Sequence, residues 1–259
     1  MKLALVQLQV LEKNKAGNVA HGLELLRQAA KEHDIVVLPE VWPTGYSLGH
    51  LQQEAESFES DLIKDICQIA KENECSILAG SIPMSHDGKI YNTSVAVSKN
   101  GSIVNYYDKV HLFGLFNEEQ FFAPGQRFNA FELDGICCGS TICYDLRFPV
   151  WARNCGNEYD LLIYVANWPT ARISSWDTLL PARAVENEAY VCGCNRIGED
   201  NMGFAHVGHS AVYDYKGGNI LAFNPDEEGI KLVELNKEGL DRFRSKFPAF
   251  KDADKFVWA

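Results

Sequence analysis

Three residues with reactive or charged side chains each stand where an apolar run ends. Cys143 follows the run GSTI, Glu40 closes the segment DIVVLPE, and Lys109 follows IVNYYD. A thiol that attacks a carbonyl carbon needs a base to take its proton and a group that stabilises the negative oxygen formed. If the three strand ends converge on one pocket, the glutamate and the lysine could fill those two roles. The sequence therefore suggests cysteine-dependent attack on a carbonyl compound.

Each of these residues also has an ordinary structural interpretation. A free cysteine is usually a small buried hydrophobe, whereas a glutamate or lysine after a strand is usually solvated. Cys143 differs from most cysteines because polar residues begin directly after it, at a strand end where loops carry function. The histidines form no local cysteine-protease signature. Six other cysteines in apolar runs are expected to be inert packing residues: Cys67, Cys75, Cys137, Cys138, Cys192 and Cys194.

The apolar pattern predicts alternating strands and helices that would position these residues. Strands are expected at 3–10, 34–40, 76–83, 91–98, 101–109, 160–167, 190–198 and 231–236. Further strands are expected at 127–145, with a turn at 134–135, and at 206–223, with a turn at 216–218. Helices are expected at 17–32, 59–74, 148–155 and about 174–189. Because no linker, low-complexity stretch or repeat divides the chain, we expect one α/β domain with helices covering its sheets.

Composition limits the class of protein and its partners. The chain has 259 residues, of which 46% are hydrophobic and 23% charged, which predicts a globular, enzyme-sized domain. A net charge of −11 disfavours nucleic acid and an anionic membrane surface as partners, because both would be repelled. No segment approaches the ~20 continuous apolar residues that span a bilayer, and the start MKLALVQLQVLEKNK is typical of a strand rather than a signal peptide. The eight cysteines include no CxxC pair, which favours reduced thiols in the cytoplasm and disfavours zinc.

Three sequence blocks occur in the order of the signature blocks of a known family. LPEVWPTGY surrounds Glu40, YDKVHLF surrounds Lys109 and ICYDLRFP surrounds Cys143, and together they resemble the nitrilase superfamily of carbon-nitrogen hydrolases. The resemblance runs through essentially the whole chain, because YVANWP, LLPARAVENEAYV and CNRIG are also similar to family segments. These later segments and the ending KFPAFKDADKF most resemble the bacterial ω-amidases of the 2-oxoglutaramate amidase type.

The resemblance implies a fold, an assembly and a catalytic triad. The implied fold is a four-layer α-β-β-α sandwich in which residues 1–259 form a single domain. The implied assembly is a homodimer or higher homo-oligomer, with a C-terminal segment at about 240–259 in the dimer contacts. Glu40 would be the general base, Cys143 the nucleophile and Lys109 the cation that stabilises the tetrahedral intermediate, helped by the backbone N–H of Tyr144. The implied substrate is a small-molecule amide, and no metal or organic cofactor is required.

Residues near the triad are expected to support it. A second glutamate assists in the family, and the block HLFGLFNEEQFFAPG offers either Glu118 or Glu119, of which Glu118 is the better match. Asp145 and Arg147 are expected to pair with each other or with neighbouring loops, and so to fix the turn that holds Cys143.

The substrate class implied by the resemblance requires a cation in an acidic protein. An ω-amidase acts on short dicarboxylate monoamides such as 2-oxoglutaramate or succinamate, which carry a free carboxylate. Arg172 in NWPTARISSW is the candidate, because a planar guanidinium binds a carboxylate through two parallel hydrogen bonds; a solvent-facing arginine is the alternative. Tyr46 and Trp168 would line the pocket. His206 and His209 have no third metal ligand beside them in the sequence and are interpreted as structural residues.

Three functions remain in competition at this point. The first is an ω-amidase, and the second is a related hydrolase that acts on another amide, such as deaminated glutathione, or on a nitrile. These two differ in the shape of the pocket. The third is a catalytically silent scaffold or a redox-sensing thiol protein, which predicts a damaged triad or a nearby resolving cysteine, whereas Glu40, Lys109 and Cys143 are all present.

Overall fold

Two six-stranded sheets form the centre of the protein in the computed structural model, which describes residues 1–254 except for the side chains of Leu51 and Gln52. In the first sheet, whose strand order is β14-β1-β2-β3-β4-β5, β1 to β3 run parallel and the other strands pair antiparallel with their neighbours. Its strands are β1 (Lys2–Gln7), β2 (Ile35–Val37), β3 (Ser76–His86), β4 (Lys89–Val97), β5 (Ile103–Asp108) and β14 (Gly229–Glu234).

The second sheet has the strand order β13-β12-β9-β8-β7-β6, and its central strands β7, β8 and β9 are parallel. Its strands are β6 (Phe131–Leu133), β7 (Ile136–Ile142), β8 (Leu161–Ala166), β9 (Tyr190–Asn195), β12 (Ala211–Tyr213) and β13 (Asn219–Ala222). A separate antiparallel ribbon, β10 (Ile197–Glu199) with β11 (Ala205–Val207), follows β9. Because parallel strands end at the same edge of a sheet, the loops after them can meet there.

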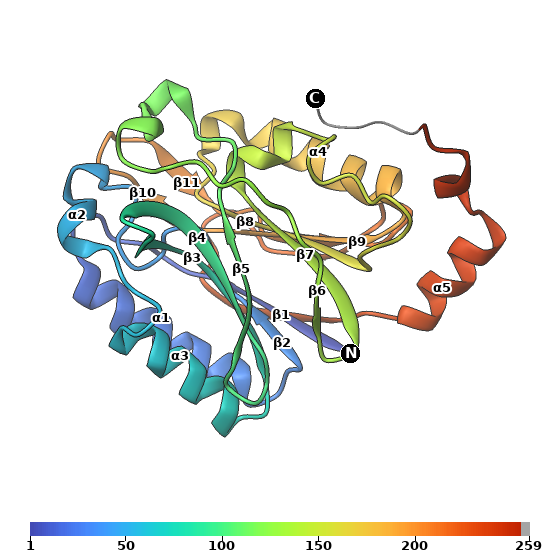
Figure 1. Cartoon of the computed structure of the whole chain (residues 1–259), viewed down its shortest axis with the longest axis horizontal. Helices are drawn as coiled ribbons and strands as arrows, with labels where there is room; N and C mark the ends of the chain where they lie inside the picture. Colours follow the sequence, from blue (N-terminus) through green and yellow to red (C-terminus); the bar gives the residue numbers. More distant parts are fainter. Residues whose placement is uncertain (255–259) are drawn as a thin grey trace.

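The two sheets pack face to face, with helices on their outer faces (Figure 1). α1 (Lys15–Ala30) and α3 (Asp61–Glu72) cover the first sheet, α4 (Ile173–Asn187) covers the second, and α2 (Leu51–Glu54) and α5 (Lys237–Lys246) lie at the margins. Between the sheets, Leu5 and Val37 of the first pack in one cluster with Ile163 and Cys194 of the second, all fully buried. The predicted four-layer α-β-β-α sandwich is therefore confirmed.

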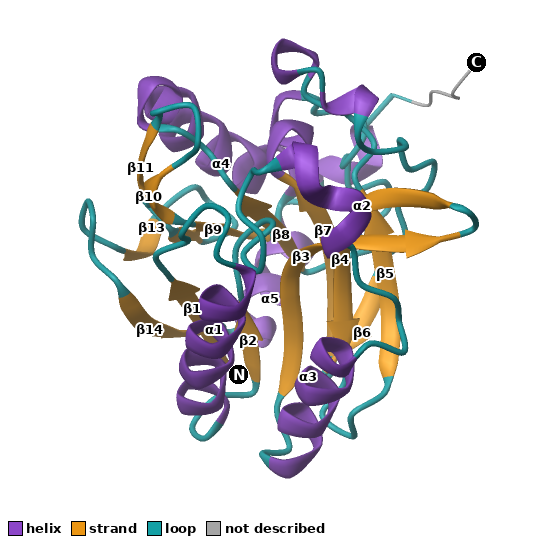
Figure 2. Cartoon of the chain, turned by 90° about the vertical axis from the view of Figure 1, so that its left-hand side faces the viewer, coloured by secondary structure: helices purple, strands orange, loops and turns teal. Residues whose placement is uncertain are grey.

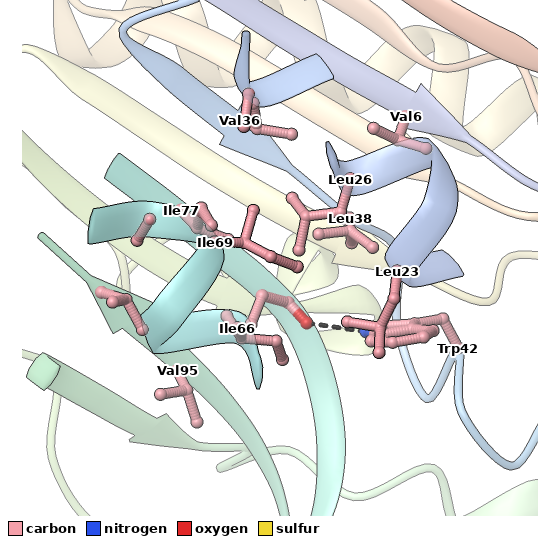
Figure 3. Packing of buried hydrophobic residues seen from close by; sticks show 14 of the residues in the cluster. Val6, Leu23, Leu26, Val36, Leu38, Trp42, Ile66, Ile69, Ile77 and Val95 are labelled. Carbon is pink, nitrogen blue, oxygen red and sulfur yellow. Dashed lines mark hydrogen bonds between the residues drawn. The ribbon is translucent and has the colours of Figure 1, made fainter. Parts of the chain in front are cut away.

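The outer layer over the first sheet also supports the loop that carries Glu40. α1 and α3 lie side by side across the sheet (Figure 2). Trp42, which is fully buried, packs into the cluster beneath them, and its Nε1 donates a hydrogen bond to the carbonyl oxygen of Ala79 at 2.8 Å (Figure 3). Gly22 of α1 gives this ring its space, because a Cβ there would lie 2.4 Å from the Trp42 side chain. The packing fixes the chain two residues beyond Glu40.

The short segment between β7 and β8 differs from its prediction. A helix was expected at 148–155, but a 3₁₀ helix occupies Cys143–Arg147 and turns follow it. Asn154, near the end of the expected helix, forms hydrogen bonds to other segments through both its backbone and its side chain. The Asn154 N–H donates to the side-chain oxygen of Asn187 at 3.0 Å, and its side chain donates to the carbonyl of Tyr159 at 2.9 Å. Both predicted hairpin turns are confirmed, at 134–135 between β6 and β7 and at 216–218 between β12 and β13.

One prediction about the cysteines was wrong. Cys137 is exposed, because alternate side chains near the start of β7 point to opposite faces and that of Cys137 points away from the core. Cys67 is half-buried, and the other four of that group are buried. All eight cysteines lie within the described residues and are free. Within residues 1–254, none of the helices combines the length and the apolar character needed to cross a membrane.

Candidate active site

The three strand ends converge, as predicted. Glu40 follows β2, Lys109 directly follows β5 and Cys143 directly follows β7. The Nζ of Lys109 lies 3.0 Å from Oε1 of Glu40, although the two residues are 69 positions apart in the sequence. Lys109 and Cys143 line the same pocket. The physical reason is that β2 and β5 run in the same direction and the two sheets end together at this edge.

The carboxylate of Glu40 is fully buried, and both of its oxygens accept hydrogen bonds. Oε1 accepts from the side-chain amide of Asn92 at 2.8 Å and from Lys109 at 3.0 Å, and Oε2 accepts from the backbone N–H of Asn167 at 2.7 Å. The Glu40 N–H donates to the carbonyl of Ala166, at the end of β8, at 3.3 Å. A buried carboxylate needs such partners to offset its desolvation. These bonds hold Glu40 in one position between the two sheets.

The ammonium group of Lys109 lies between two buried carboxylates. Besides Glu40 it donates to Oε1 of Glu118 at 2.9 Å, and Glu118 also accepts the backbone N–H of Phe113. Burial alone would lower the pKa of Lys109, but Glu118 and Glu40 outweigh that effect and raise the pKa well above its usual value. Lys109 therefore stays charged. Of the two candidate glutamates only Glu118 reaches the site, since Glu119 is exposed.

Cys143 occupies an unusual backbone conformation at the junction of β7 and the 3₁₀ helix. Its φ is 47°, in the left-handed region that costs a residue other than glycine about 1–2 kcal/mol. Its Sγ lies 4.0 Å from the carbonyl oxygen of Asn167. Burial and the Glu40 carboxylate raise the pKa of the thiol well above its usual value, while Lys109 opposes them. The resting thiol is therefore protonated at neutral pH and needs a base to become a nucleophile.

Asp145 fixes the turn after Cys143, as predicted. Its buried Oδ2 accepts hydrogen bonds from the Ile142 N–H at 2.9 Å and the Tyr107 hydroxyl at 2.8 Å. Its Oδ1 faces His111, whose backbone N–H donates at 3.0 Å and whose Nδ1 lies at 2.7 Å. Tyr107 and His111 stand on either side of Lys109 in the sequence. Asp145 thus ties the lysine segment to the cysteine segment.

Tyr46, Tyr144, Trp168 and Arg172, which were expected to contact the substrate, all line the pocket that contains Cys143. The pocket is open to solvent at its mouth. The Trp168 ring nitrogen donates to the carbonyl oxygen of Arg172 at 2.8 Å, which joins two of these residues in one wall. Burial raises the pKa of Tyr46 well above its usual value, and the Glu118 and Glu40 carboxylates add to this effect. The phenol therefore remains a neutral donor. The lining residues are Tyr46, Lys109, Phe113, Phe116, Cys143, Tyr144, Arg147, Asn167, Trp168, Pro169, Arg172, Asp200 and His206.

Sequence reasoning missed several of these lining residues. Arg147 was assigned to the turn, but within residues 1–254 it forms no ion pair with Asp145, and its guanidinium lies 5.1 Å from the centre of the Trp168 ring. Its place in the same short block as Cys143 was the signal that could have placed it near the pocket. Phe113 and Phe116 carry no distinctive signal, because aromatic residues in a loop usually indicate packing.

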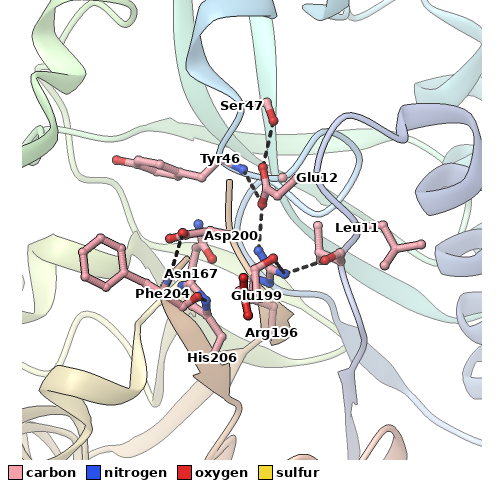
Figure 4. A network of polar contacts seen from close by, with 12 residues as sticks. Leu11, Glu12, Tyr46, Ser47, Asn167, Arg196, Glu199, Asp200, Phe204 and His206 are labelled. Carbon is pink, nitrogen blue, oxygen red and sulfur yellow. Dashed lines mark hydrogen bonds and ion pairs between the residues drawn. The ribbon is translucent and has the colours of Figure 1, made fainter. Parts of the chain in front are cut away.

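A buried polar network supports the wall of the pocket that includes Tyr46 (Figure 4). Arg196 is fully buried and donates from Nη1 to Oε1 of Glu12 at 2.9 Å. The same Oε1 accepts the Tyr46 N–H at 3.1 Å, and Oε2 accepts the Ser47 hydroxyl at 2.8 Å. Asp200 organises the neighbouring turn, since its Oδ1 accepts the N–H of Phe204 at 3.0 Å. The loops after β1, β2 and β9 are therefore joined at the pocket.

The two histidines noted in the sequence lie in different surroundings. His206 is buried in the pocket wall, and burial together with the Arg196 guanidinium lowers its pKa to about 3, so it is neutral. His209 is partly exposed and its Nδ1 lies 3.2 Å from Asp177. No group of three or more His, Cys, Asp or Glu side chains within residues 1–254 is arranged to hold a metal ion. The chemistry that this arrangement can support is covalent attack by a thiol beside a carboxylate and an ammonium group.

Comparisons with known proteins identify the family of the chain. The sequence profile described as carbon-nitrogen hydrolase matches residues 2–245. The chain is 35% identical to the omega-amidase YafV of Yersinia enterocolitica over 99% of this chain and 98% of that protein. It is 34% identical to the 2-oxoglutaramate amidase of Bacillus subtilis over 93% of each chain. A CN-hydrolase superfamily protein of Xanthomonas campestris superposes with a TM-score of 0.95 at 33% identity, covering 100% of this chain and 99% of the other. The protein therefore belongs to the carbon-nitrogen hydrolase family, whose members include amidases.

Proposed function

We propose that this protein is an ω-amidase that hydrolyses the terminal amide of short dicarboxylate monoamides, such as 2-oxoglutaramate and succinamate, to the acid and ammonia. The observation that carries the proposal is the presence of the Arg172 guanidinium in the same pocket as the Cys143 thiol and the Lys109 ammonium. A monoamide of this class has an amide at one end for the thiol and a carboxylate at the other for the guanidinium. Relatives named omega-amidase and 2-oxoglutaramate amidase, matched over nearly the whole chain, support the same assignment.

In the first half of the proposed reaction, Cys143 Sγ attacks the amide carbon while Glu40 takes the thiol proton. The carbon–sulfur bond forms and the carbonyl electron pair moves onto oxygen. Lys109 and the Tyr144 N–H would stabilise that negative oxygen, and one such donor is typically worth about 3 kcal/mol in the transition state. When the intermediate collapses, the carbon–nitrogen bond breaks, Glu40 returns the proton to the leaving nitrogen, and ammonia departs from a thioester.

In the second half, water hydrolyses the thioester. Glu40 takes a proton from the attacking water, a carbon–oxygen bond forms, and collapse of the intermediate breaks the carbon–sulfur bond. The Glu40 proton then returns to the sulfur of Cys143, and the carboxylic acid leaves. Glu118 contributes by holding Lys109 in its charged form beside Glu40 throughout the cycle. Every proton is accounted for by these side chains and water.

The test is ammonia release from a panel of 2-oxoglutaramate, succinamate, glutamine, deaminated glutathione and simple nitriles. We expect the highest kcat/KM on the two monoamides that carry a carboxylate and lack an amino group. Activity confined to nitriles or to bulky amides would overturn the ω-amidase assignment. Full turnover by Cys143→Ala on the preferred substrate would overturn the mechanism.

We further propose that residues 1–259 form a single domain and that the protein is cytoplasmic. Two copies would form a homodimer, with the segment at about 240–259 in the dimer contacts. Residues 255–259 lie outside the described residues. Phe247 at the end of α5 is 60% exposed, and Val150 and Phe250 line one surface cavity nearby, which leaves apolar area for a second copy. Sedimentation velocity should give a two-chain particle for the wild type and a shift to monomer for Phe247→Asp. A monomeric wild type would contradict this part of the proposal.

A further inference from the structure

We propose that Arg183, on the outer helix α4, is a positioning residue for the nucleophile. Its guanidinium holds the 3₁₀ helix of Cys143–Arg147, and so fixes both the Cys143 thiol and the backbone N–H of the residue after it. This inference rests on the proposed function, in which the thiol attacks the amide carbon and that N–H stabilises the oxyanion. Arg183 is not among the residues that line the pocket, so its effect passes through the backbone of the short helix.

One carbonyl group of the 3₁₀ helix has no partner in the backbone. Such a helix pairs each carbonyl with the N–H three residues later, as the Asp145 carbonyl accepts from the Phe148 N–H at 2.9 Å. For Leu146 the residue three positions later is Pro149, which has no N–H. Leu146 is fully buried, so bulk water does not replace the missing donor. Its carbonyl oxygen accepts instead from Nη2 of Arg183 at 2.7 Å.

The packing of α4 alone does not explain a charged side chain at this position. Leu180 and Ala184, which are also buried, lie in one apolar cluster with Leu146 of the 3₁₀ helix. Arg183 is only 4% exposed, and its burial has a desolvation cost that an apolar residue would avoid. The guanidinium therefore contributes something that packing cannot, and its bond to the Leu146 carbonyl joins α4 to the segment of the nucleophile.

A partner on α4 sets the orientation of the guanidinium. Nη1 of Arg183 donates to Oε1 of Glu186, about one turn further along the helix, at 3.1 Å. The Glu186 side chain is 31% exposed and that of Arg183 only 5%, so the ion pair lies toward the solvent and the bond to Leu146 toward the core. Because the guanidinium is planar, fixing two of its nitrogens also fixes the direction of the bond to the Leu146 carbonyl.

The 3₁₀ helix is thus held on two sides. Asp145, within it, bonds to the backbone of His111 on the lysine segment, and Arg183 bonds the other end of the helix to α4. This support matters because the φ of Cys143 is 47°, and a left-handed conformation of this kind persists only when the surrounding structure enforces it. Loss of the Arg183 bond would leave a buried carbonyl unsatisfied and let the helix relax. A displacement of about 1 Å at a reacting group can lower the rate about 100-fold.

The decisive experiment compares Arg183→Met with the wild type on succinamate, at a temperature where both are folded. We expect kcat to fall roughly 10- to 100-fold while KM stays within about 2-fold, because the residues that contact the substrate remain and only the nucleophile and its oxyanion donor are displaced. Arg183→Lys keeps a charged donor on a long side chain and should recover part of kcat. Glu186→Gln keeps an acceptor for Nη1 and should leave kcat within about 2-fold of the wild type, since that side chain is partly exposed.

Ser76→Ala is the matched control, because it also removes buried hydrogen bonds between segments. The Ser76 hydroxyl donates to Asp134 at 2.6 Å and accepts the Lys99 N–H at 3.1 Å. These bonds lie where β3 begins and just before β7, at the edge of the sheets opposite to Cys143. Ser76→Ala should therefore lower the melting temperature, because a buried donor loses its partner, but leave kcat unchanged.

A kcat for Arg183→Met that matches that of Ser76→Ala would make Arg183 a purely structural residue and overturn the inference, and so would a loss confined to KM. Should Arg183→Met fail to fold, Arg183→Gln, with a shorter and neutral side chain, gives the same comparison. The proposed function is tested separately. A wild type that does not hydrolyse succinamate, or full turnover by Cys143→Ala, would overturn the proposed function and the inference with it.

Discussion

The protonation state of the Cys143 thiol is set by burial and by two neighbouring groups of opposite charge. Burial and the Glu40 carboxylate raise the pKa of the thiol, while the Lys109 ammonium lowers it. Because the net effect is upward, the thiol carries its proton until the substrate arrives. In the proposed mechanism Glu40 therefore removes the proton during the attack, and a stable thiolate does not precede it.

This balance predicts that Glu40→Gln lowers the pKa of Cys143 while it abolishes hydrolysis. The substitution removes a negative charge beside the thiol, which favours the thiolate, and leaves Lys109 in place. The rate of iodoacetamide alkylation should then rise at a lower pH than in the wild type. Peptide-resolved mass spectrometry distinguishes Cys143 from the exposed Cys137 and Cys155, whose profiles serve as internal controls. A Cys143 profile that stays in place or moves to higher pH would contradict the electrostatic account.

The two adjacent glutamates at 118 and 119 provide a second residue-level prediction. The Glu118 carboxylate is the strongest of the charges that raise the pKa of Lys109 against the effect of burial, so Glu118→Gln should lower that pKa relative to the wild type, with Glu40 still raising it. Lys109 would lose its charge at a lower pH, and the alkaline limb of the kcat profile should shift in that direction. We expect kcat at neutral pH to fall roughly 10- to 100-fold, in the range for a weakened oxyanion donor. Glu119→Gln, at an exposed position beside it, is the control and should leave kcat unchanged.

At the scale of elements, the 3₁₀ helix of Cys143–Arg147 connects the end of β7 to the turns that follow it. It turns the chain sharply at the end of β7, where the thiol lies in the pocket. This turn requires a left-handed φ at Cys143, which carries a conformational cost for a residue other than glycine. Asp145 stabilises the junction with bonds to groups before it and on the lysine segment. The stability of the element and the position of the nucleophile therefore depend on the same carboxylate.

We predict that Asp145→Asn lowers the free energy of unfolding by about 2–4 kcal/mol, because an amide cannot accept at both atoms and leaves buried donors unsatisfied. Asp177→Asn is the matched control, since Asp177 also faces a histidine but its side chain is 43% exposed. Asp177→Asn should change the free energy of unfolding by no more than about 0.5 kcal/mol. Urea unfolding measures both variants. Equal stability of the two variants would show that the hydrogen bonds of Asp145 contribute little to the junction.

At the scale of the whole molecule, the pocket depends on loops from both sheets. Arg196, after β9, reaches the loop after β1 through Glu12 and the carbonyl oxygen of Val10, and Glu12 in turn holds the loop after β2 through Ser47. These contacts cross the interface between the sheets and are almost free of solvent. They couple the docking of the two sheets to the shape of the substrate pocket.

Arg196→Met should therefore affect both stability and substrate binding. Removing one partner of a buried ion pair typically costs about 3–5 kcal/mol, and we expect a loss of unfolding free energy in that range. KM should rise as well, because Glu12 also fixes the backbone of Tyr46. Arg242→Met removes an ion pair whose side chains are 66% and 90% exposed, and should change stability by less than about 1 kcal/mol. A normal KM in a clearly destabilised Arg196→Met would show that the contacts of Arg196 stabilise the fold without shaping the substrate pocket.

Local patterns were sufficient for much of the architecture. The alternation of apolar residues predicted most of the strands within a few residues, and the turns at 134–135 and 216–218 followed from residues that tolerate positive φ. It did not predict the separate ribbon of β10 and β11, because 190–198 and the segment from 206 were each expected to be one continuous strand. The helix expected at 148–155 is absent, and the backbone and side chain of Asn154 form hydrogen bonds to Asn187 and Tyr159 instead. The prediction that Cys137 is a packing residue was wrong, because the alternation of side chains along a strand does not tell which face is covered by other elements near its end.

The sequence by itself determined the family and most of the order of the elements, and it singled out Glu40, Lys109 and Cys143 as candidates, because these are properties of local pattern and motif order. Only the tertiary structure decided which residues share the pocket. It placed Glu118 rather than Glu119 beside Lys109, the Arg147 side chain against Trp168 rather than with Asp145, and the partly buried Glu12 beside the fully buried Arg196. Those outcomes depend on distances between segments far apart in the chain, and such distances are set by how two sheets pack, not by any single stretch of sequence.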